Sequence, residues 1–229
     1  MKNAKAPWMF CALAALGVTA LIQPARASVI NWSFANGSTA TADPTTITTS
    51  EVTGGTMSLV NPHTAAAMLD NSSASSGYTG ASGSYNAQAS FNNTNGVTAT
   101  STGYTFTLTP AANTTLTFTN MSLGQRSTGT GPVAFWLYSD QTSNPIVSMT
   151  VNTDSTWHLY QFVPFSVSAS TPITFTLYGT SGGTSSSPNG RIDDVTLTYT
   201  AVSTPEPASL GLLGVGGAAL LARRRSSRR

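Results

Sequence analysis

Alternation of threonine with apolar residues constrains the fold of this chain more than any other feature. In GYTFTLTP, Tyr104, Phe106 and Leu108 share one parity and threonines occupy the other. The same pattern returns in TTLTFTN, PITFTLYG and DDVTLTYT. Because successive side chains of a strand point to opposite faces, a period of two predicts half-buried antiparallel strands here.

Turn-forming segments such as PAAN, DQTSNP and GTSGGTSSSPNG separate these strands. Two further segments, PVAFWLYS and WHLYQFVPF, are apolar on both parities, which predicts central strands or strands covered on both sides. The sequence shows no fixed-period repeat and no long helical pattern between the two ends. It therefore predicts an all-β fold, with a single antiparallel β-sandwich over residues 28–200.

The first 27 residues have the features of a secretory signal peptide, including a signal helix. Lys2 and Lys5 precede an uncharged apolar segment, and the small residues Ala25 and Ala27 predict cleavage before Ser28. This predicts export by the general secretion machinery. The chain's one cysteine lies inside the apolar segment, so the mature protein would have neither a disulfide nor a cysteine nucleophile.

Residues 201–229 form a tail with three consecutive parts. Pro205-Glu206-Pro207 comes first, followed by a mostly apolar segment over 208–222 and by an arginine cluster over 223–229. As a transmembrane helix, 15 residues would span about 22 Å, which is short against a hydrocarbon core of about 30 Å. Arginines resist translocation and would stop the chain in the membrane. These stop residues are Arg223, Arg224, Arg225, Arg228 and Arg229.

A tail of this kind has three interpretations: a nucleic-acid-binding segment, a retained membrane anchor and a sorting signal. The order of motif, helix and basic end over 204–229 resembles the PEP-CTERM sorting domain. That resemblance implies handling by an exosortase, a membrane-embedded cysteine protease, which would cut near Pro205-Glu206-Pro207. The protein would be tethered by its C-terminal helix before processing and would then reach the cell surface or the extracellular space.

The body between the two ends carries little charge. Between residues 28 and 204 there are seven acidic residues and two arginines, a net charge of −5, whereas the whole chain is at +2. A body of this charge has no electrostatic footprint for nucleic acid. No catalytic residue is predicted, because His63 and His158 have no metal or triad spacing and G-x-S-x-G is absent.

The body also resembles a group of bacterial jelly-roll domains found on exported PEP-CTERM proteins. NWSFANG, GQRSTGTGPVAFWLYSD and RIDDVTLT carry this resemblance, which covers most of residues 29–199. It implies a jelly-roll topology for the sandwich. It implies no particular activity, so the function of the body has to be argued from its own residues.

Asp193-Asp194 is the one pair of adjacent carboxylates in the body. In a regular strand, neighbours point to opposite faces, so the two are not expected to act at one site. Asp193 has the parity of the core, and a buried carboxylate needs a partner. That partner could be Arg126 or backbone N–H groups. It could also be a structural calcium ion, as in related carbohydrate-binding jelly rolls, with oxygen ligands from Asn31, Ser33 and Asn36. No other cofactor is predicted.

Trp136, Tyr138, Trp157 and Tyr160 form the main aromatic concentration. At strand spacing they could fill the core, whereas exposed rings could stack on sugars. The sequence thus favours a non-enzymatic protein of the cell surface or extracellular matrix. The alternative is a carbohydrate-binding module for exopolysaccharide that uses Trp136 or Trp157. A hydrolase is the third and least favoured function.

Overall fold

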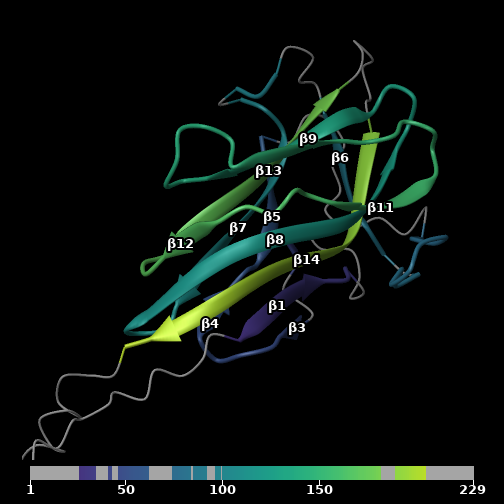
Figure 1. Cartoon of the computed structure of the whole chain (residues 1–229). Coiled ribbons are helices and arrows are strands. Elements are labelled where there is room, and N and C mark those ends of the chain that lie inside the picture. Colours follow the sequence, from purple (N-terminus) through teal and green to yellow (C-terminus); the bar gives the residue numbers. More distant parts are fainter. Residues whose placement is uncertain are drawn as a thin grey trace, which may run out of the picture.

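The computed structural model describes residues 26–34, 41–42, 46–61, 74–83, 85–91, 96–98, 100–181 and 189–204. Every regular element in these ranges is a β-strand, and the strands form two antiparallel sheets, sheet A and sheet B. The sheets pack against one another with a hydrophobic core between them (Figure 1). This confirms the predicted all-β sandwich, while its jelly-roll topology stays a prediction.

Sheet A has the order β11-β8-β14-β1-β3, with β12 also paired to β8 and β6 to β14. Its two long strands, β8 and β14, run side by side along almost their whole length. The strands of sheet A are β1 (Ala27–Trp32), β3 (Thr46–Ile47), β6 (Ala87–Ser90), β8 (Thr114–Ser127), β11 (Trp157–Gln161), β12 (Val167–Ala169) and β14 (Asn189–Ser203).

Sheet B has the order β10-β9-β13-β7-β5-β2, with β4 also paired to β7. The strands of sheet B are β2 (Thr41–Ala42), β4 (Val52–Gly54), β5 (Met57–Val60), β7 (Gly103–Pro110), β9 (Pro132–Ser139), β10 (Val147–Thr150) and β13 (Ile173–Ser181).

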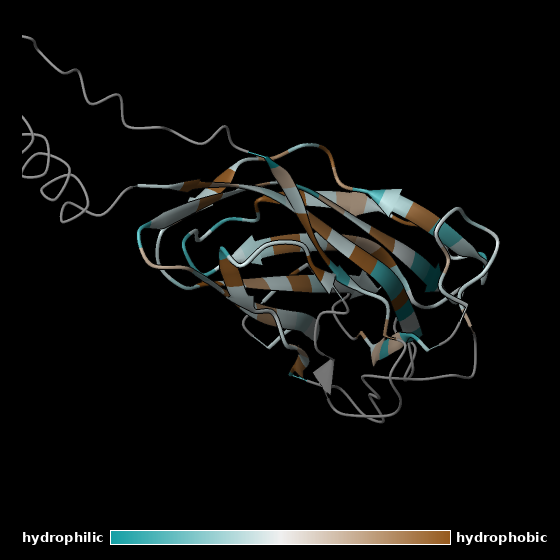
Figure 2. Ribbon diagram, turned by 90° about the horizontal axis from the view of Figure 1, so that it is seen from below, coloured by the Kyte–Doolittle hydropathy of each residue, from teal (hydrophilic) through white to brown (hydrophobic). Residues whose placement is uncertain are grey.

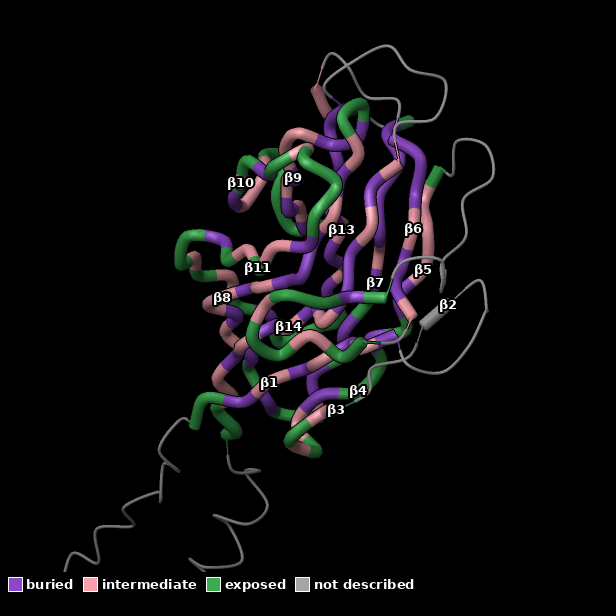
Figure 3. The backbone as a smooth tube through the Cα atoms, turned by 90° about the vertical axis from the view of Figure 1, so that its right-hand side faces the viewer, coloured by how far each residue is buried: buried purple, intermediate pink, exposed green. Residues whose placement is uncertain are grey.

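The alternating pattern of the sequence becomes the two faces of each sheet. Hydrophobic and hydrophilic residues alternate along the strands (Figure 2), and buried residues line the space between the sheets (Figure 3). Phe175 of β13 contacts Phe106 of β7 and Phe118 of β8, with ring centroids 5.6 and 5.0 Å away. Because Phe118 belongs to sheet A and the other two to sheet B, these aromatic rings join the two sheets.

The prediction for PVAFWLYS is confirmed, because β9 lies between β10 and β13. The prediction for WHLYQFVPF is wrong. In the part of the chain that the structure describes, β11 lies at the end of sheet A, and Leu159 is 50% exposed. Trp157 and Leu159 share one face of β11. Tyr78 of the segment 74–83 packs against Trp157, whereas Leu159 on the same face is half exposed.

Both ends of the body lie at the same end of sheet A. Ala27 at the start of β1 pairs with Thr200 near the end of β14 (Figure 1). The predicted signal helix and C-terminal helix fall outside the described residues, apart from residues 26–27. Among the residues that are described, no helix is long and apolar enough to cross a membrane.

Candidate functional site

A β-bulge in β14 brings the two adjacent carboxylates together. The register against β8 shifts between Asp193, opposite Gly124, and Thr196, opposite Ser122. Asp194 takes up the extra residue with φ of +49°, a left-handed conformation that aspartate tolerates better than most residues. The expectation that the two side chains point to opposite faces is therefore wrong, because it assumed a regular strand.

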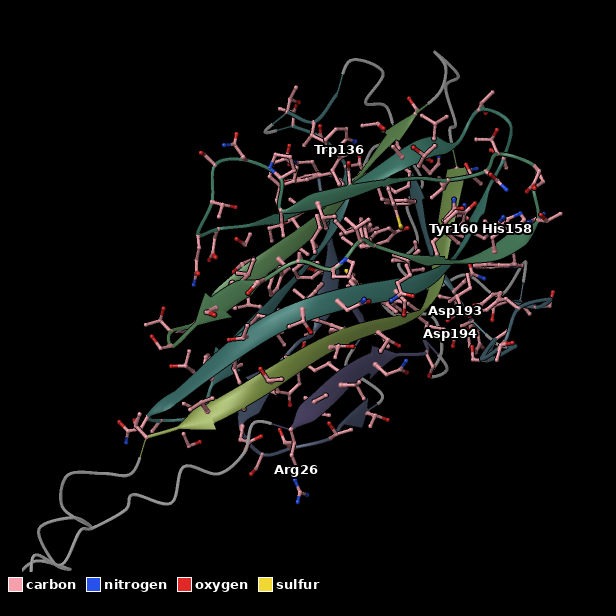
Figure 4. All side chains as sticks on the ribbon, viewed as in Figure 1. Arg26, Trp136, His158, Tyr160, Asp193 and Asp194 are labelled. Atoms are coloured by element: carbon pink, nitrogen blue, oxygen red, sulfur yellow. The ribbon has the colours of Figure 1, made fainter. Side chains whose placement is uncertain are left out.

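Ser82 binds both carboxylates. Its hydroxyl donates to Asp193 Oδ2 at 3.1 Å, and its backbone N–H donates to Asp194 Oδ2 at 3.0 Å. Tyr78 donates its hydroxyl to the same Asp194 oxygen at 2.6 Å. The Asp194 N–H in turn donates to Asp193 Oδ1 at 2.8 Å. These bonds tie segment 74–83 to the bulge; Figure 4 labels the two aspartates.

The donors named above are hydroxyl and amide groups, none of which carries a charge. Asp193 is fully buried, and that burial raises the pKa of its carboxyl to about 7, with the neighbouring charge of Asp194 adding to the rise. Burial also raises the pKa of Tyr78, and its bond to Asp194 contributes. When both carboxyls are deprotonated, the pair is a concentrated site of negative charge held by neutral groups, which is the kind of site that attracts a cation.

The residues expected to bind calcium are only partly brought together. The Ser33 carbonyl lies near the pair, with its oxygen 3.5 Å from the Ser82 hydroxyl oxygen. Asn31 instead donates its side-chain amide to Thr196 Oγ1 at 3.0 Å. Asn36 lies outside the described residues. Arg126, the alternative partner, donates Nε to the Ser155 carbonyl at 2.6 Å.

Chemically, the site fits a hard cation better than a transition metal. In the described ranges, no three His, Cys, Asp or Glu side chains meet as a metal site would require. A cation at Asp193 and Asp194 would take further oxygens from carbonyl and hydroxyl groups, as calcium does. The hydroxyls of Tyr78 and Ser82 contact the carboxylates directly, and the carbonyl of Ser33 lies beside the Ser82 hydroxyl.

His158 meets a carboxylate that the sequence analysis did not assign to it. Its Nε2 lies 2.8 Å from Asp154 Oδ2 and 2.7 Å from Thr156 Oγ1. A catalytic triad needs both ring nitrogens, one for the nucleophile and one for the acid, whereas both contacts here use Nε2. The D-x-T-x-H spacing is the signal that could have predicted this cluster. His63 lies outside the described residues.

The same cluster closes the turn between β10 and β11. Asp154 accepts bonds from the N–H of Thr156 at 3.0 Å and from its hydroxyl at 2.7 Å. These bonds, followed by the contact with His158, lower the pKa of Asp154 to about 2. An aspartate that binds the backbone two residues later is a turn-forming motif. The arrangement therefore accounts for the turn without a catalytic role.

Trp157 is not placed for sugar stacking. It is 9% exposed, and its ring centroid lies 6.5 Å from that of Tyr78. Tyr78 itself lies over Gly124, where an added Cβ would collide with the phenol hydroxyl. The indole is thus part of the packing that holds segment 74–83 against sheet A.

Trp136 lies on the outer face of sheet B, half-buried (Figure 4). It pairs across the sheet with Tyr178, whose ring contacts Tyr138 at 5.5 Å between centroids. Threonines extend this face: Thr107 and Thr174 hydroxyls are 2.9 Å apart, and Thr176 donates to Thr105 at 3.2 Å. The sequence analysis did not single out Tyr178, although it shares the parity of the threonines in PITFTLYG.

The residues at the two processing sites are only partly described. Ala27 is already in β1, and Ser28 is 6% exposed. Thr204 is the last described residue at the other end. The sorting and stop residues and Ala25 lie outside the described ranges, so their roles stay predictions.

A known protein-sorting motif matches the C-terminal tail of the chain. Residues 203–226 match the PEP-CTERM protein-sorting motif. The chain therefore carries a PEP-CTERM motif. This motif implies an exported cell-surface protein that is sorted by an exosortase. The match covers the Pro-Glu-Pro sequence, the apolar segment and the first arginines.

No curated protein is similar enough to the chain to count as a relative. Among solved structures, the K1 cleaved adhesin domain of Lys-gingipain from Porphyromonas gingivalis W83 is 12% identical with a TM-score of 0.39, covering 74% of this chain and 96% of that one. The K3 domain of the same protein is 14% identical with a TM-score of 0.37, covering 76% of this chain and 99% of that one. Similarity at this level does not define the function of the body.

Proposed function

We propose that this protein is cut by an exosortase near Pro205-Glu206-Pro207 and that its β-sandwich then acts on the cell surface or in the extracellular matrix without catalysis. The observation that carries this proposal is the junction between fold and motif. The last strand ends at Ser203, and the match to the sorting motif begins at the same residue. Cleavage in the motif would therefore release the whole sandwich intact.

The geometry of the polar clusters supports a non-enzymatic body. His158 uses one nitrogen for both its neighbours, and the two adjacent aspartates are engaged by neutral donors from segment 74–83. Each cluster joins segments of the fold, which is a structural task. An adhesive or structural protein needs such rigid connections between its loops and sheets.

Intact-mass measurement of the protein recovered from the native surface or culture medium tests the proposal. A chain that begins at Ser28 and ends near Pro205-Glu206-Pro207 is the expected result, with or without an added acceptor group. A Glu206→Gln variant is the matched control, because it tests whether recognition of the motif depends on the charge of Glu206. A wild-type chain that still contains Arg229 would contradict exosortase cleavage and indicate a retained anchor.

A carbohydrate-binding body is the second candidate function. The Trp136 face, defined as Trp136, Tyr138 and Tyr178 with the neighbouring threonines of β7 and β13, favours it. Its aromatic rings and hydroxyl groups carry no formal charge. Neutral sugar rings stack on aromatic side chains and exchange hydrogen bonds with hydroxyls. A neutral exopolysaccharide is therefore the ligand class that this face fits.

A structural calcium ion at Asp193 and Asp194 is proposed as well. The support is the pair of carboxylates, one of them fully buried, beside the Ser33 carbonyl. Bound there, calcium would balance the negative charge of the bulge and hold segment 74–83 in place.

A further inference from the structure

The Pro205-Glu206-Pro207 sequence directly follows a residue that is hydrogen-bonded to the sandwich. The N–H of Thr204 donates to the Asn113 carbonyl at 2.9 Å, and its hydroxyl donates to the same oxygen at 3.1 Å. Next to it, the hydroxyls of Ser203 and Thr114 are 3.0 Å apart. Pro205 follows Thr204 directly in the sequence. The residues immediately before the motif are therefore held against β8 and the turn that precedes it.

This attachment conflicts with the needs of a protease. A bound peptide is extended and is recognised over several residues, and cleavage occurs where the chain is locally open. While Val202 and Ser203 are paired with Thr115 and Thr114, their backbone cannot enter a second binding cleft. Only Thr204 would separate that cleft from the body of the sandwich.

We propose that the end of β14, residues 200–204, detaches from β8 to deliver the motif to the exosortase. We call these five residues the release strip. This inference rests on the proposed exosortase cleavage. Five extended residues add about 16 Å of reach between the sandwich and the motif, at about 3.3 Å per residue.

The exposed part of the strip is weakly held. Val202 is 41% exposed, and Ser203 and Thr204 are exposed as well. In the described register, β1 pairs no further along β14 than Thr200, whose partner is Ala27. Cleavage after Ala27 would remove that partner and leave the strip bonded to β8 alone. Opening of such a strand end costs little free energy compared with unfolding of the core.

Tyr199 marks where detachment ends. Its side chain is fully buried, its ring packs 6.0 Å from that of Phe118, and its hydroxyl lies 2.6 Å from Thr49 Oγ1. Detachment of β14 beyond this residue would expose a large aromatic ring. It would also break the bond from the Tyr199 hydroxyl to Thr49, which follows β3. Release therefore stops before the core opens, so the motif can be cut while the sandwich stays folded.

A disulfide across the strip tests this proposal in the full exported chain. Thr114 and Ser203 are changed to cysteine together, since their hydroxyls already face each other across the strand pair. The mature chain has no native cysteine to interfere. Thr117→Cys with Ser168→Cys is the matched control, because their hydroxyls are also a Thr–Ser pair, 2.9 Å apart, but join β8 to β12 instead of to β14.

Because cleavage of an opened segment follows the population of its open form, we expect the Thr114–Ser203 cross-link to slow tail removal by about tenfold or more. The Thr117–Ser168 cross-link should leave the rate unchanged. Reductant should restore the rate of the first variant, which also shows that this variant is exported and folded. Tail removal is measured from the loss of residues 208–229 in intact-mass spectra over time.

A six-residue Gly/Ser insertion between Thr204 and Pro205 supplies a second test, because it provides reach without detachment. It should restore processing of the cross-linked chain and speed that of the wild type. Processing of the cross-linked chain at the wild-type rate would overturn the proposal. So would an insertion that leaves the processing rates of both the cross-linked chain and the wild type unchanged. Retention of Arg229 in the wild type itself would instead overturn the proposed cleavage, and with it this inference.

Discussion

The phenol of Tyr78 donates a hydrogen bond to Asp194 Oδ2 across 2.6 Å, although the two residues are 116 positions apart in the sequence. The bond depends on two backbone features. The bulge turns Asp194 toward segment 74–83, and Gly124 leaves space for the phenol on the outer face of β8. This side-chain contact and the two bonds from Ser82 together hold an irregular segment against the last strand of sheet A.

Replacement of Tyr78 by Phe should destabilise the protein. The variant keeps the ring against Trp157 but leaves Asp194 without its shortest hydrogen bond. A hydrogen bond to a charged group contributes about 1.5–3 kcal/mol, so the free energy of unfolding should fall by about that amount. Urea denaturation of the mature protein measures this loss. Hydrogen exchange should show faster exchange in segment 74–83 first.

Tyr138→Phe is the control for this prediction. It removes the same hydroxyl from a half-buried ring on sheet B, away from the bulge. Its free energy of unfolding should stay close to that of the wild type. Equal effects of the two substitutions would show that the Tyr78–Asp194 bond does not stabilise the fold.

In calcium-free buffer, the free energy of unfolding should fall as the pH rises from about 4 to about 7. Burial raises the pKa of Asp193 to about 7 in the folded protein, whereas an aspartate in the unfolded chain has a pKa of about 3.9. Between these values the folded state binds more protons than the unfolded state. The slope of stability against pH is then negative. Stability from this group is complete below about pH 4 and is lost above about pH 7.

Urea titrations from pH 4 to 8 measure that slope, and Asp193→Asn should abolish it. Asp140→Asn, an exposed carboxylate after β9, is the matched control and should keep it. Asp154 has the opposite effect on the pH dependence of stability, because its pKa is lowered to about 2 in the folded protein. Its contribution changes only below about pH 4, outside the range of this experiment. A wild-type stability that rises from pH 4 to 7 would contradict the assignment to Asp193.

The strands and the core were predictable because burial imposes a period of two on them. Phe106, Phe118 and Phe175 all fall on the predicted inner parity and all are buried between the sheets. The edge position of β11 was not predictable, since apolar residues on both parities do not distinguish a central strand from an edge strand whose Trp157 is covered by the distant segment 74–83. The alternation of residues shows which side chains share a face of a strand, but it does not show what packs against that face.

The bulge site was missed for a related reason. Period-two reasoning assigns Asp193 and Asp194 to opposite faces and fails once one residue takes φ of +49°. Tyr78 lies in a Ser/Gly-rich segment that has no hydrophobic pattern, so nothing local indicates its contact with Asp194. The His158 cluster is different, because a turn with D-x-T-x-H spacing could have been recognised from the sequence alone.

Calcium should stabilise the wild-type protein. An ion bound by Asp193 and Asp194 binds the folded state alone, so the melting temperature should rise with calcium concentration and fall after chelation with EDTA. The Asp193→Asn variant should lose most of this response. Asp140→Asn should retain it. Equal melting temperatures of the wild type in calcium and in EDTA would contradict the proposed ion.

The two tryptophans should behave differently in a glycan assay. Trp136→Ala removes a half-buried ring from the Trp136 face, and we expect about tenfold weaker retention on the cell's own exopolysaccharide, equivalent to about 1.4 kcal/mol. Trp157 is 9% exposed and packs beneath Tyr78, so Trp157→Ala should instead lower the free energy of unfolding by about 3–5 kcal/mol. Retention of the folded Trp157 variant should match the wild type. Affinity electrophoresis through polysaccharide-containing gels measures the first effect and urea denaturation the second. If the Trp136 variant migrates like the wild type in every gel, this face does not bind the polysaccharide and the body is better explained as a structural protein.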